Sequence, residues 1–265
     1  MGSKKKSLLW EINHPESIRT SYLFGTMHVK DNKAFSKVDL VLKCMKECNL
    51  LACEYNLEEA RGKGLGEVLM LPDQKRLIDL VGERKYARWK KICAKAFSLD
   101  LDQVQRLLPM TIISVLSERL MQKDNAVSLD QFLWEQGTEM GLKLDGVERF
   151  EDQKMIMGEI EVSDQLKMLK DLFKNVNSFK KQINKLLKLY QQEEIHELFK
   201  RSKKSLGKYK HLLLHQRNEK MADSIFLLTE DHNAFIAIGA AHLSGKVGVL
   251  HLLKKKGLKL KPLSS

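Results

Sequence analysis

Two histidines close similar motifs near opposite ends of this chain. Residues 21–28 read SYLFGTMH and residues 234–242 read AFIAIGAAH, so in each an apolar run precedes glycine, two further residues and histidine. A short apolar run of this kind is typical of a buried strand. A histidine placed just after it lies at the carboxyl end of the strand, where open α/β sheets keep their sites. The repeated motif therefore predicts that His28 and His242 reach one pocket.

A glutamate follows a third apolar run, because Glu54 comes directly after residues 50–53, LLAC. A buried carboxylate is costly unless it is paired, ligating or hydrated. Together with His28 and His242, it could hold a divalent metal (manganese, cobalt or zinc) and leave one position open for water. The same residues could also act without metal, with one histidine as general base and the carboxylate orienting it. The structural alternative is an exposed Glu54 in a turn.

Two more charged residues are weaker candidates. Glu148 follows the predicted strand over residues 142–147 and could add an acidic group at the same rim, or cap the next helix. Arg217, in a polar helical segment with Asn218, could stabilise an oxyanion or hold a carboxylate. Alternatively, it forms a salt bridge on the helix surface. His211 and His215 lack the glutamate of an H-E-x-x-H metal motif, so we interpret them as a surface pair.

The elements that must position these residues are short strands at both ends of the chain and helices in the middle. The predicted strands are Leu8–Ile12, Tyr22–Met27, Leu50–Tyr55, Leu142–Val147, Phe235–Ile238 and Leu258–Pro262. Helical periodicity covers Phe35–Glu47 and most of the chain from Pro72 to Leu228, including a pair of helices between Ser163 and Tyr190. We therefore predict an α+β fold in a single domain over residues 1–265. Its mixed sheet is built from both chain ends and flanked by helices, with a large helical insertion over about residues 72–230, interrupted by the strand near 142–147.

The net charge of +12 is placed unevenly. Residues 1–162 carry 25 Lys and Arg against 25 Asp and Glu, whereas residues 163–265 carry 21 against 9. A basic surface over residues 163–265 could contact an acidic partner or simply be a solvated helix face. Nucleic acid is disfavoured as a partner, because aromatic residues are not interleaved with the lysines as a single-strand binder requires. The sequence does not indicate an oligomeric state.

Cysteine usage and hydropathy indicate the cellular compartment of the protein. The four cysteines, Cys44, Cys48, Cys53 and Cys93, form no C-x-x-C pair, and we expect free buried thiols, which favour a reducing compartment. No apolar run approaches the length of a membrane span. The start of the chain lacks the long apolar core of a secretion signal. We therefore expect a cytoplasmic protein, or an exported or cell-envelope protein whose signal was removed.

Taken together, the motifs resemble those of the TraB/PrgY/GumN family, which includes the animal TIKI proteins. The resemblance rests on residues 21–29, Leu50–Tyr55, residues 129–153, the RN and MA pairs at 217–218 and 221–222, and residues 234–263. The family is similar to a wider group that contains erythromycin esterases and haem-binding proteins. The resemblance implies a mixed sheet flanked by helices, with the site at one sheet edge. It also implies hydrolase chemistry, since TIKI proteins are metal-dependent proteases whose two G-x-x-H motifs are essential.

Carried onto this chain, the resemblance implies a site of His28, Glu54 and His242, with Arg217 and Glu148 as additions. The function predicted is a metal-dependent hydrolase of a peptide or ester substrate. In it, a divalent metal lowers the pKa of a bound water molecule. The alternative is a binding protein without turnover, which uses the same pocket to sequester a peptide, a haem or another small molecule.

Overall fold

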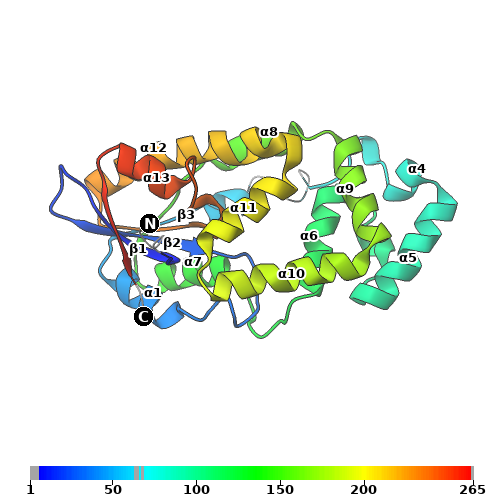
Figure 1. Ribbon diagram of the computed structural model, residues 1–265, viewed down its shortest axis with the longest axis horizontal. Helices are drawn as coiled ribbons and strands as arrows, with labels where there is room; N and C mark the ends of the chain where they lie inside the picture. Colours follow the sequence, from blue (N-terminus) through cyan, green and yellow to red (C-terminus); the bar gives the residue numbers. More distant parts are fainter. Residues whose placement is uncertain (1–5, 63–65, 67–68, 264–265) are drawn as a thin grey trace. The chain divides into compact units, whose positions relative to one another are not determined.

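A mixed sheet lies at the centre of the structure, a computed structural model that describes residues 6–62, 66 and 69–263. Its strands are β1 (Leu9–Asn13), β2 (Thr20–Thr26), β3 (Leu50–Cys53), β4 (Lys143–Gly146), β5 (Ala234–Gly239) and β6 (Lys259–Leu263). They form one six-stranded sheet in the order β4-β3-β5-β2-β1-β6. Figure 1 shows β1, β2 and β3 of this sheet. The α+β class and the mixed sheet built from both chain ends are thus confirmed.

The strands that carry the candidate residues are neighbours and run in the same direction. β5, from the end of the chain, lies between β2 and β3 from its beginning and is parallel to both, and β3 is parallel to β4. β1 is antiparallel to β2 and to β6. Since parallel strands end at the same edge of a sheet, the residues that follow β2, β3, β4 and β5 meet at one edge.

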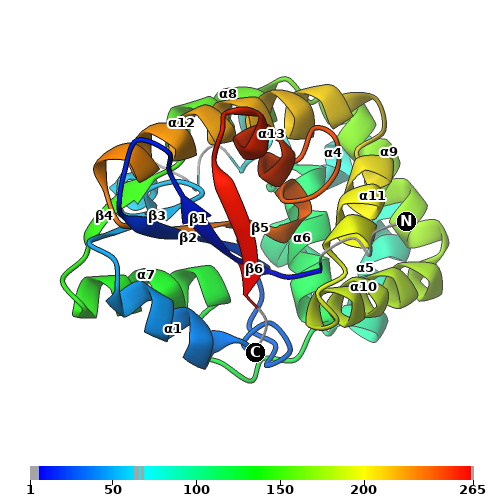
Figure 2. The same ribbon diagram turned by 60° about the vertical axis from the view of Figure 1, so that its left-hand side comes forward.

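Helices cover both faces of this sheet, which explains why its central strands are continuously apolar. All four residues of β3 are buried, as are the first five of β5. In Figure 2, α1 (Val38–Lys46) and α7 (Leu129–Glu139) lie below the sheet, and α12 (Arg217–Asp231) and α13 (Val249–Lys255) lie above it. The helix predicted over Phe35–Glu47 is present as α1.

Further helices lie wholly or mostly in the sheet unit, which comprises residues 1–60, 123–156 and 186–265. They are α2 (Leu57–Gly62), α8 (Phe150–Gly158), α11 (Ile195–Ser205), the 3-10 helices η3 (Gly207–Tyr209) and η5 (Ala240–His242), and the π-helix η4 (His211–Gln216). α11 is amphipathic and buries Ile195, Leu198 and Phe199. Its opposite face carries lysine and arginine.

A second compact unit is helical and consists of residues 61–122 and 157–185. Its elements are η1 (Pro72–Gln74), α4 (Leu77–Val81), α5 (Glu83–Phe97), η2 (Leu101–Val104), α6 (Pro109–Arg119), α9 (Val162–Lys174) and the first part of α10 (Val176–Gln191). Its core contains Trp89 stacked on Phe173, with ring centroids 4.6 Å apart. The helix pair predicted between Ser163 and Tyr190 is present as α9 and α10.

Not all of the expected helical insertion lies in this second unit. Residues 123–156 and 186–230 pack within the sheet unit, because α7, β4 and α12 contribute directly to the sheet and its cover. The description of the whole chain as a single domain stays a prediction.

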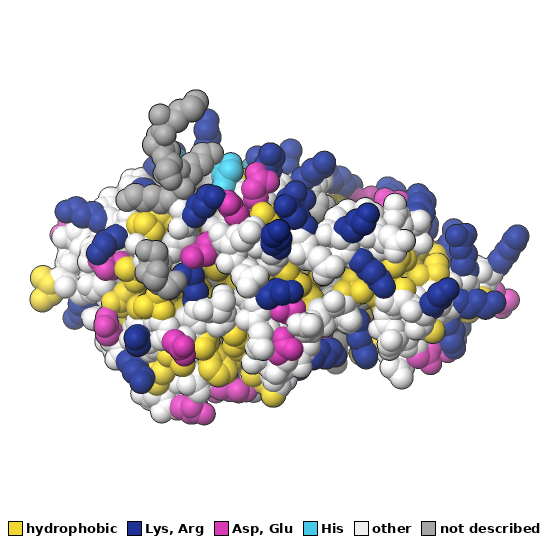
Figure 3. Space-filling view, turned by 60° about the horizontal axis from the view of Figure 1, so that its bottom comes forward, with side chains coloured by type: hydrophobic (Ala, Val, Ile, Leu, Met, Phe, Trp, Pro, Cys, Tyr) yellow, Lys and Arg dark blue, Asp and Glu magenta, His cyan; other side chains and the backbone are white. Residues whose placement is uncertain are grey.

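The four cysteines are free and buried, as the sequence indicates. Within the described residues, no helix is both long and apolar enough to cross a membrane. On the face shown in Figure 3, Lys and Arg side chains are spread over the surface among fewer Asp and Glu side chains. Contact with an acidic surface through residues 163–265 stays a prediction.

Candidate functional site

Four neighbouring strand ends carry four of the residues singled out in the sequence. In the spatial order β4, β3, β5, β2, the strands are followed by Glu148, Glu54, His242 and His28. Glu54 comes directly after β3, and the backbone N–H of Glu148 donates to the Glu54 carbonyl over 2.9 Å. His242 lies in η5, which follows β5 at once. The parallel topology therefore brings both chain ends to this edge.

Arg217, the fifth candidate, lies at the start of α12 and holds two carboxylates. Its Nη2 pairs with Oε1 of Glu54 and lies 2.5 Å from Oε2 of Glu148. Its Nε donates to both Glu148 oxygens, over 3.2 and 3.1 Å. Gln153 adds hydrogen bonds to Oε1 of Glu54 and Oε2 of Glu148, over 3.3 and 3.2 Å. Arg217 is largely buried, so it is not a helix-surface salt bridge, and Glu148 does not serve as a helix cap alone.

The two carboxylates differ in their affinity for a proton. Burial alone would raise the pKa of Glu54, but Arg217 and His242 lower it to about 2. Burial raises the pKa of Glu148 above its ordinary value, and the neighbouring Glu54 charge adds to this rise, although Arg217 opposes it. One guanidinium thus faces two carboxylates, of which Glu54 is the stronger acid.

His242 is buried and has a defined tautomer. Its Nδ1 lies 2.6 Å from Oδ1 of Asn218, whose amide nitrogen donates to the carbonyl of Val247 over 2.7 Å. Since that donation turns the amide oxygen toward the ring, Nδ1 must carry the hydrogen, and Nε2 keeps its lone pair. Burial, with a contribution from Arg217, lowers the pKa of His242 to about 4, although Glu54 opposes this. The ring is therefore neutral near pH 7 and can accept a proton.

His28, unlike His242, is positively charged near pH 7. Its side chain is 60% exposed, and its Nδ1 lies 2.7 Å from Oδ2 of the buried Asp130. The other Asp130 oxygen accepts a hydrogen bond from Thr26 over 2.6 Å. Desolvation alone would lower the pKa of His28, but the charge and hydrogen bond of Asp130 raise it to about 9. The ring is therefore protonated near pH 7, with Nδ1–H donating to Asp130.

The glycines of the two G-x-x-H motifs differ in how closely their neighbours approach. A methyl group at Gly239 would lie 3.4 Å from both Oε2 of Glu54 and Cδ2 of His242, and the Gly239 N–H donates to that Glu54 oxygen over 3.3 Å. A methyl group at Gly25 would lie 2.6 Å from Cδ1 of Leu243 and 3.1 Å from Cα of Ala240. At Gly25, therefore, the lack of a side chain lets η5 lie against the end of β2, whereas at Gly239 a methyl group would make only ordinary contacts.

The residues as placed do not fit the three-ligand metal centre that the sequence predicts. Within the described part of the chain, no group of three or more His, Cys, Asp and Glu side chains is placed to hold one ion. Glu54, the expected third ligand, has Oε1 bound by Arg217 and Gln153 and Oε2 facing the Gly239 N–H. His28 and His242 nevertheless both lie close enough to Glu54 for their charges to lower its pKa.

Sequence reasoning did not single out Asp130, and it named Asn218 without the role of orienting a ring. It assigned that role to Glu54, whereas the structure gives it to Asp130 for His28 and to Asn218 for His242. Asp130 does leave a signal in the sequence. It precedes Leu133 and Trp134 by one helical turn and so lies on the apolar face of α7, where an unpaired carboxylate would be costly.

Comparison with known proteins relates this chain to one protein family. A model of the TraB/PrgY/gumN family matches residues 8–262. A curated relative from Amphimedon queenslandica, described as a metalloprotease TIKI homolog, is 26% identical over 319 aligned residues. That alignment covers 98% of this chain and 62% of the relative, so the chain spans less than two thirds of the relative's length. No solved structure matches the chain.

Proposed function

Because the chain belongs to the TraB/PrgY/GumN family, we propose that it is a hydrolase that cleaves a peptide or ester bond with its two histidines. The proposal rests on one observation. His242 and His28 both lower the pKa of Glu54, yet the pKa of His242 is itself lowered to about 4 and that of His28 is raised to about 9. Titratable groups whose surroundings push their pKa values apart are suited to act as a base and an acid. Between pH 4 and pH 9, the His242 ring is neutral and the His28 ring is protonated.

In the proposed reaction, Nε2 of His242 accepts a proton from a water molecule while the water oxygen attacks the substrate carbonyl. The Nε2–H of His28 then donates its proton to the leaving amine or alkoxide as the carbon–nitrogen or carbon–oxygen bond breaks. His242 ends protonated and His28 neutral, and proton exchange with solvent restores both. One water molecule is consumed for each bond cleaved.

The surrounding residues support these two steps. The Glu54 carboxylate offsets the positive charge that His242 gains, and Arg217 keeps Glu54 ionised and in place. Asp130 and Asn218 are positioning residues, because each fixes a ring through Nδ1 and directs Nε2 to the reaction, as in the orienting role of a triad acid.

A separate question is whether the proposed hydrolysis requires a metal ion. The curated relative is described as a metalloprotease, and manganese, cobalt and zinc are the ions to test. His28, Glu54 and His242 as placed do not form a three-ligand centre, so the proposed steps use none of these ions. We therefore expect turnover to survive treatment with EDTA.

The test is hydrolysis of a peptide library and of chromogenic esters by purified full-length protein, with EDTA and with each added ion. We expect His242→Gln and His28→Gln to lower turnover by about 10²–10⁴-fold, whereas His211→Gln, on the exposed side of η4, leaves it unchanged. Equal activity in all three variants would contradict the proposal. Strict recovery by one ion after EDTA would replace the metal-free steps with a metal-dependent reaction.

The same protein samples test the alternative of binding without turnover. If no peptide or ester is cleaved, a haem titration followed by visible absorbance becomes the decisive measurement. A Soret shift that is lost in His28→Gln or His242→Gln would then indicate a protein that sequesters haem.

A further inference from the structure

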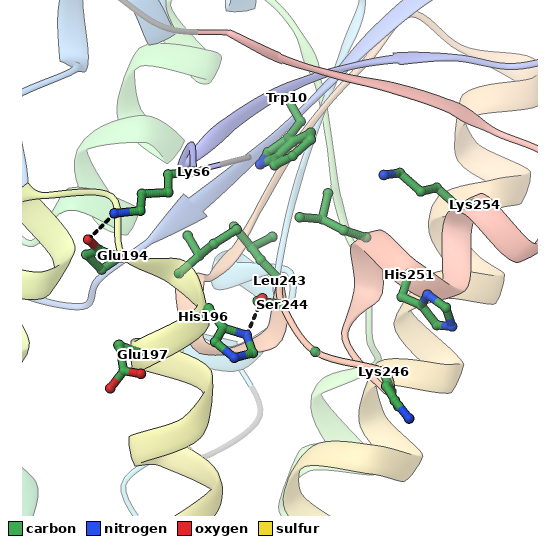
Figure 4. Close-up of a pocket in the computed structure, with 13 residues that line it drawn as sticks. Lys6, Trp10, Glu194, His196, Glu197, Leu243, Ser244, Lys246, His251 and Lys254 are labelled. Atoms are coloured by element: carbon green, nitrogen blue, oxygen red, sulfur yellow. Dashed lines mark hydrogen bonds and ion pairs between the residues drawn. The ribbon is translucent and has the colours of Figure 1, made fainter. Parts of the chain in front are cut away.

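A second concave site lies in the sheet unit, apart from the candidate active site. It is a pocket of about 640 Å³, formed by the start of β1, the first turn of α11, the loop after η5, and α13 (Figure 4). None of His28, Glu54, Glu148, Arg217 or His242 lines it. Its volume falls in the range of pockets that hold small organic ligands.

The floor of this pocket is apolar. Trp10, which is 3% exposed, contributes its indole ring, and Ile195, Leu243 and Leu250 are buried beside it. The indole N–H donates to the carbonyl of Ser7 over 2.8 Å, so Trp10 offers the pocket only its carbon surface. A ligand that fills the floor must therefore bring an apolar body.

The rim carries positive charge that the protein itself does not neutralise. Lys246 and Lys254 are exposed, and within the described residues neither forms an ion pair. By contrast, Lys6 on the opposite side is paired with Glu194. The Lys254 ammonium lies 6.0 Å from the centroid of the Trp10 ring, so a cation and the apolar floor adjoin each other.

The surface near the pocket reinforces this charge. The acidic residue Glu197 of the rim lies 3.8 Å from Lys200 on the same helix. Beyond it, the exposed side of α11 adds Arg201 and Lys204 without an intervening carboxylate. A surface of one charge sign raises the local concentration of ligands of the opposite sign.

We propose that this pocket binds an amphiphilic carboxylic acid in its ionised form. The carboxylate pairs with Lys254, and the acyl chain lies on Trp10, Leu243 and Leu250. The pairing with Lys254 is favoured because the same ammonium adjoins the Trp10 ring, so head and chain are recognised together. This inference is independent of the proposed hydrolysis, because it uses none of the residues assigned to that reaction.

The pocket also adjoins the segment that follows His242. Leu243 and Gly245 belong both to the pocket lining and to the chain immediately after η5. Gly245 packs tightly on Phe199 of α11, since a methyl group there would lie 2.5 Å from the phenyl ring. The pocket wall is therefore closely packed against α11.

The test is calorimetric titration of the full-length protein with decanoate and with decyltrimethylammonium, both kept below the concentrations at which they form micelles. We expect decanoate to bind with a 1:1 stoichiometry and the cation of equal chain length to show no binding. The variant Lys254→Gln should weaken decanoate binding about tenfold, since it removes the charge-assisted contact with the carboxylate. Lys255→Gln, on the same helix but outside the pocket lining, is the matched control and should bind as the wild type does.

Three results would overturn the proposal: no binding of decanoate, equal affinity for the two detergents, or the same affinity in Lys254→Gln and in Lys255→Gln. All these side chains are exposed, so the variants should fold. Hydrolase assays on the same samples keep the two proposals apart, because neither lysine takes part in the proposed reaction.

Discussion

Nδ1 of His28 lies 2.7 Å from Oδ2 of Asp130, a contact that joins the end of β2 to the first turn of α7. The corresponding atom of His242 faces a neutral amide, Asn218. Two histidines from the same G-x-x-H motif thus differ in charge near pH 7, because their Nδ1 partners differ and because His242 is buried and His28 is exposed. The following predictions concern this asymmetry and the contacts that support it.

Asp130→Asn should lower the pKa of His28 from about 9 toward its ordinary value of 6.5, because the charge that stabilises the imidazolium is removed. His28 must be protonated to act as an acid, so activity at pH 8 should fall about tenfold or more, with a smaller loss at pH 6. NMR titration of the His28 ring and a pH–rate profile measure both effects. Asp171→Asn, at an exposed site, is the control; an unchanged His28 pKa in Asp130→Asn would contradict the prediction.

The pH–rate profile of the wild type should be bell-shaped. Activity should rise with pH as His242 loses its proton, near pH 4, and fall as His28 loses its own, near pH 9. In His242→Gln the residual activity should lose the acidic limb, whereas the alkaline limb should remain. A profile that keeps both limbs in His242→Gln would assign the acidic limb to another group.

Arg217→Gln should destabilise the fold strongly, because it leaves Glu54 and the buried Glu148 without their shared partner. Removing one partner of a buried pair costs about 3 kcal/mol or more in the free energy of unfolding. Urea denaturation at pH 7 measures the loss. The matched control is Lys200→Gln, which breaks an exposed pair with Glu197 and should cost less than about 1 kcal/mol.

The same loss should depend on pH in a defined direction. The pKa of Glu54 is lowered in the native state, from 4.5 to about 2, so its contribution to stability is complete above pH 4.5 and disappears as the pH falls toward 2. The difference between wild type and Arg217→Gln should therefore shrink on acidification. A difference that is constant from pH 7 to pH 3 would contradict this account.

Gly25→Ala should destabilise the protein by about 1–3 kcal/mol, because the added methyl group overlaps Leu243 and crowds Ala240 of η5. Activity should fall with it, since η5 carries His242. Gly158→Ala is the matched control, because a methyl group there meets no atom within 4 Å. Chemical denaturation compares the two, and equal stabilities would show that η5 can move away from β2 without cost.

Much of the strand pattern could be predicted from the sequence. Central strands such as β3 and β5 are buried on both faces, so continuous apolar runs followed by glycine or a charged residue marked their ends. His28, Glu54 and His242 were recognisable for the same reason, because each is the first chemically distinctive residue after such a run.

What the sequence alone determined is the set of residues at the strand ends; what only the tertiary structure decided is how each is charged and what it touches. Asp130 reaches His28, and Arg217 reaches Glu54, through contacts between elements far apart in the chain. A pKa depends on burial and on charges within a few ångströms, and neither is encoded in local spacing. For this reason the residues predicted as three metal ligands are, in the folded chain, an arginine-bridged carboxylate pair flanked by one neutral and one protonated histidine.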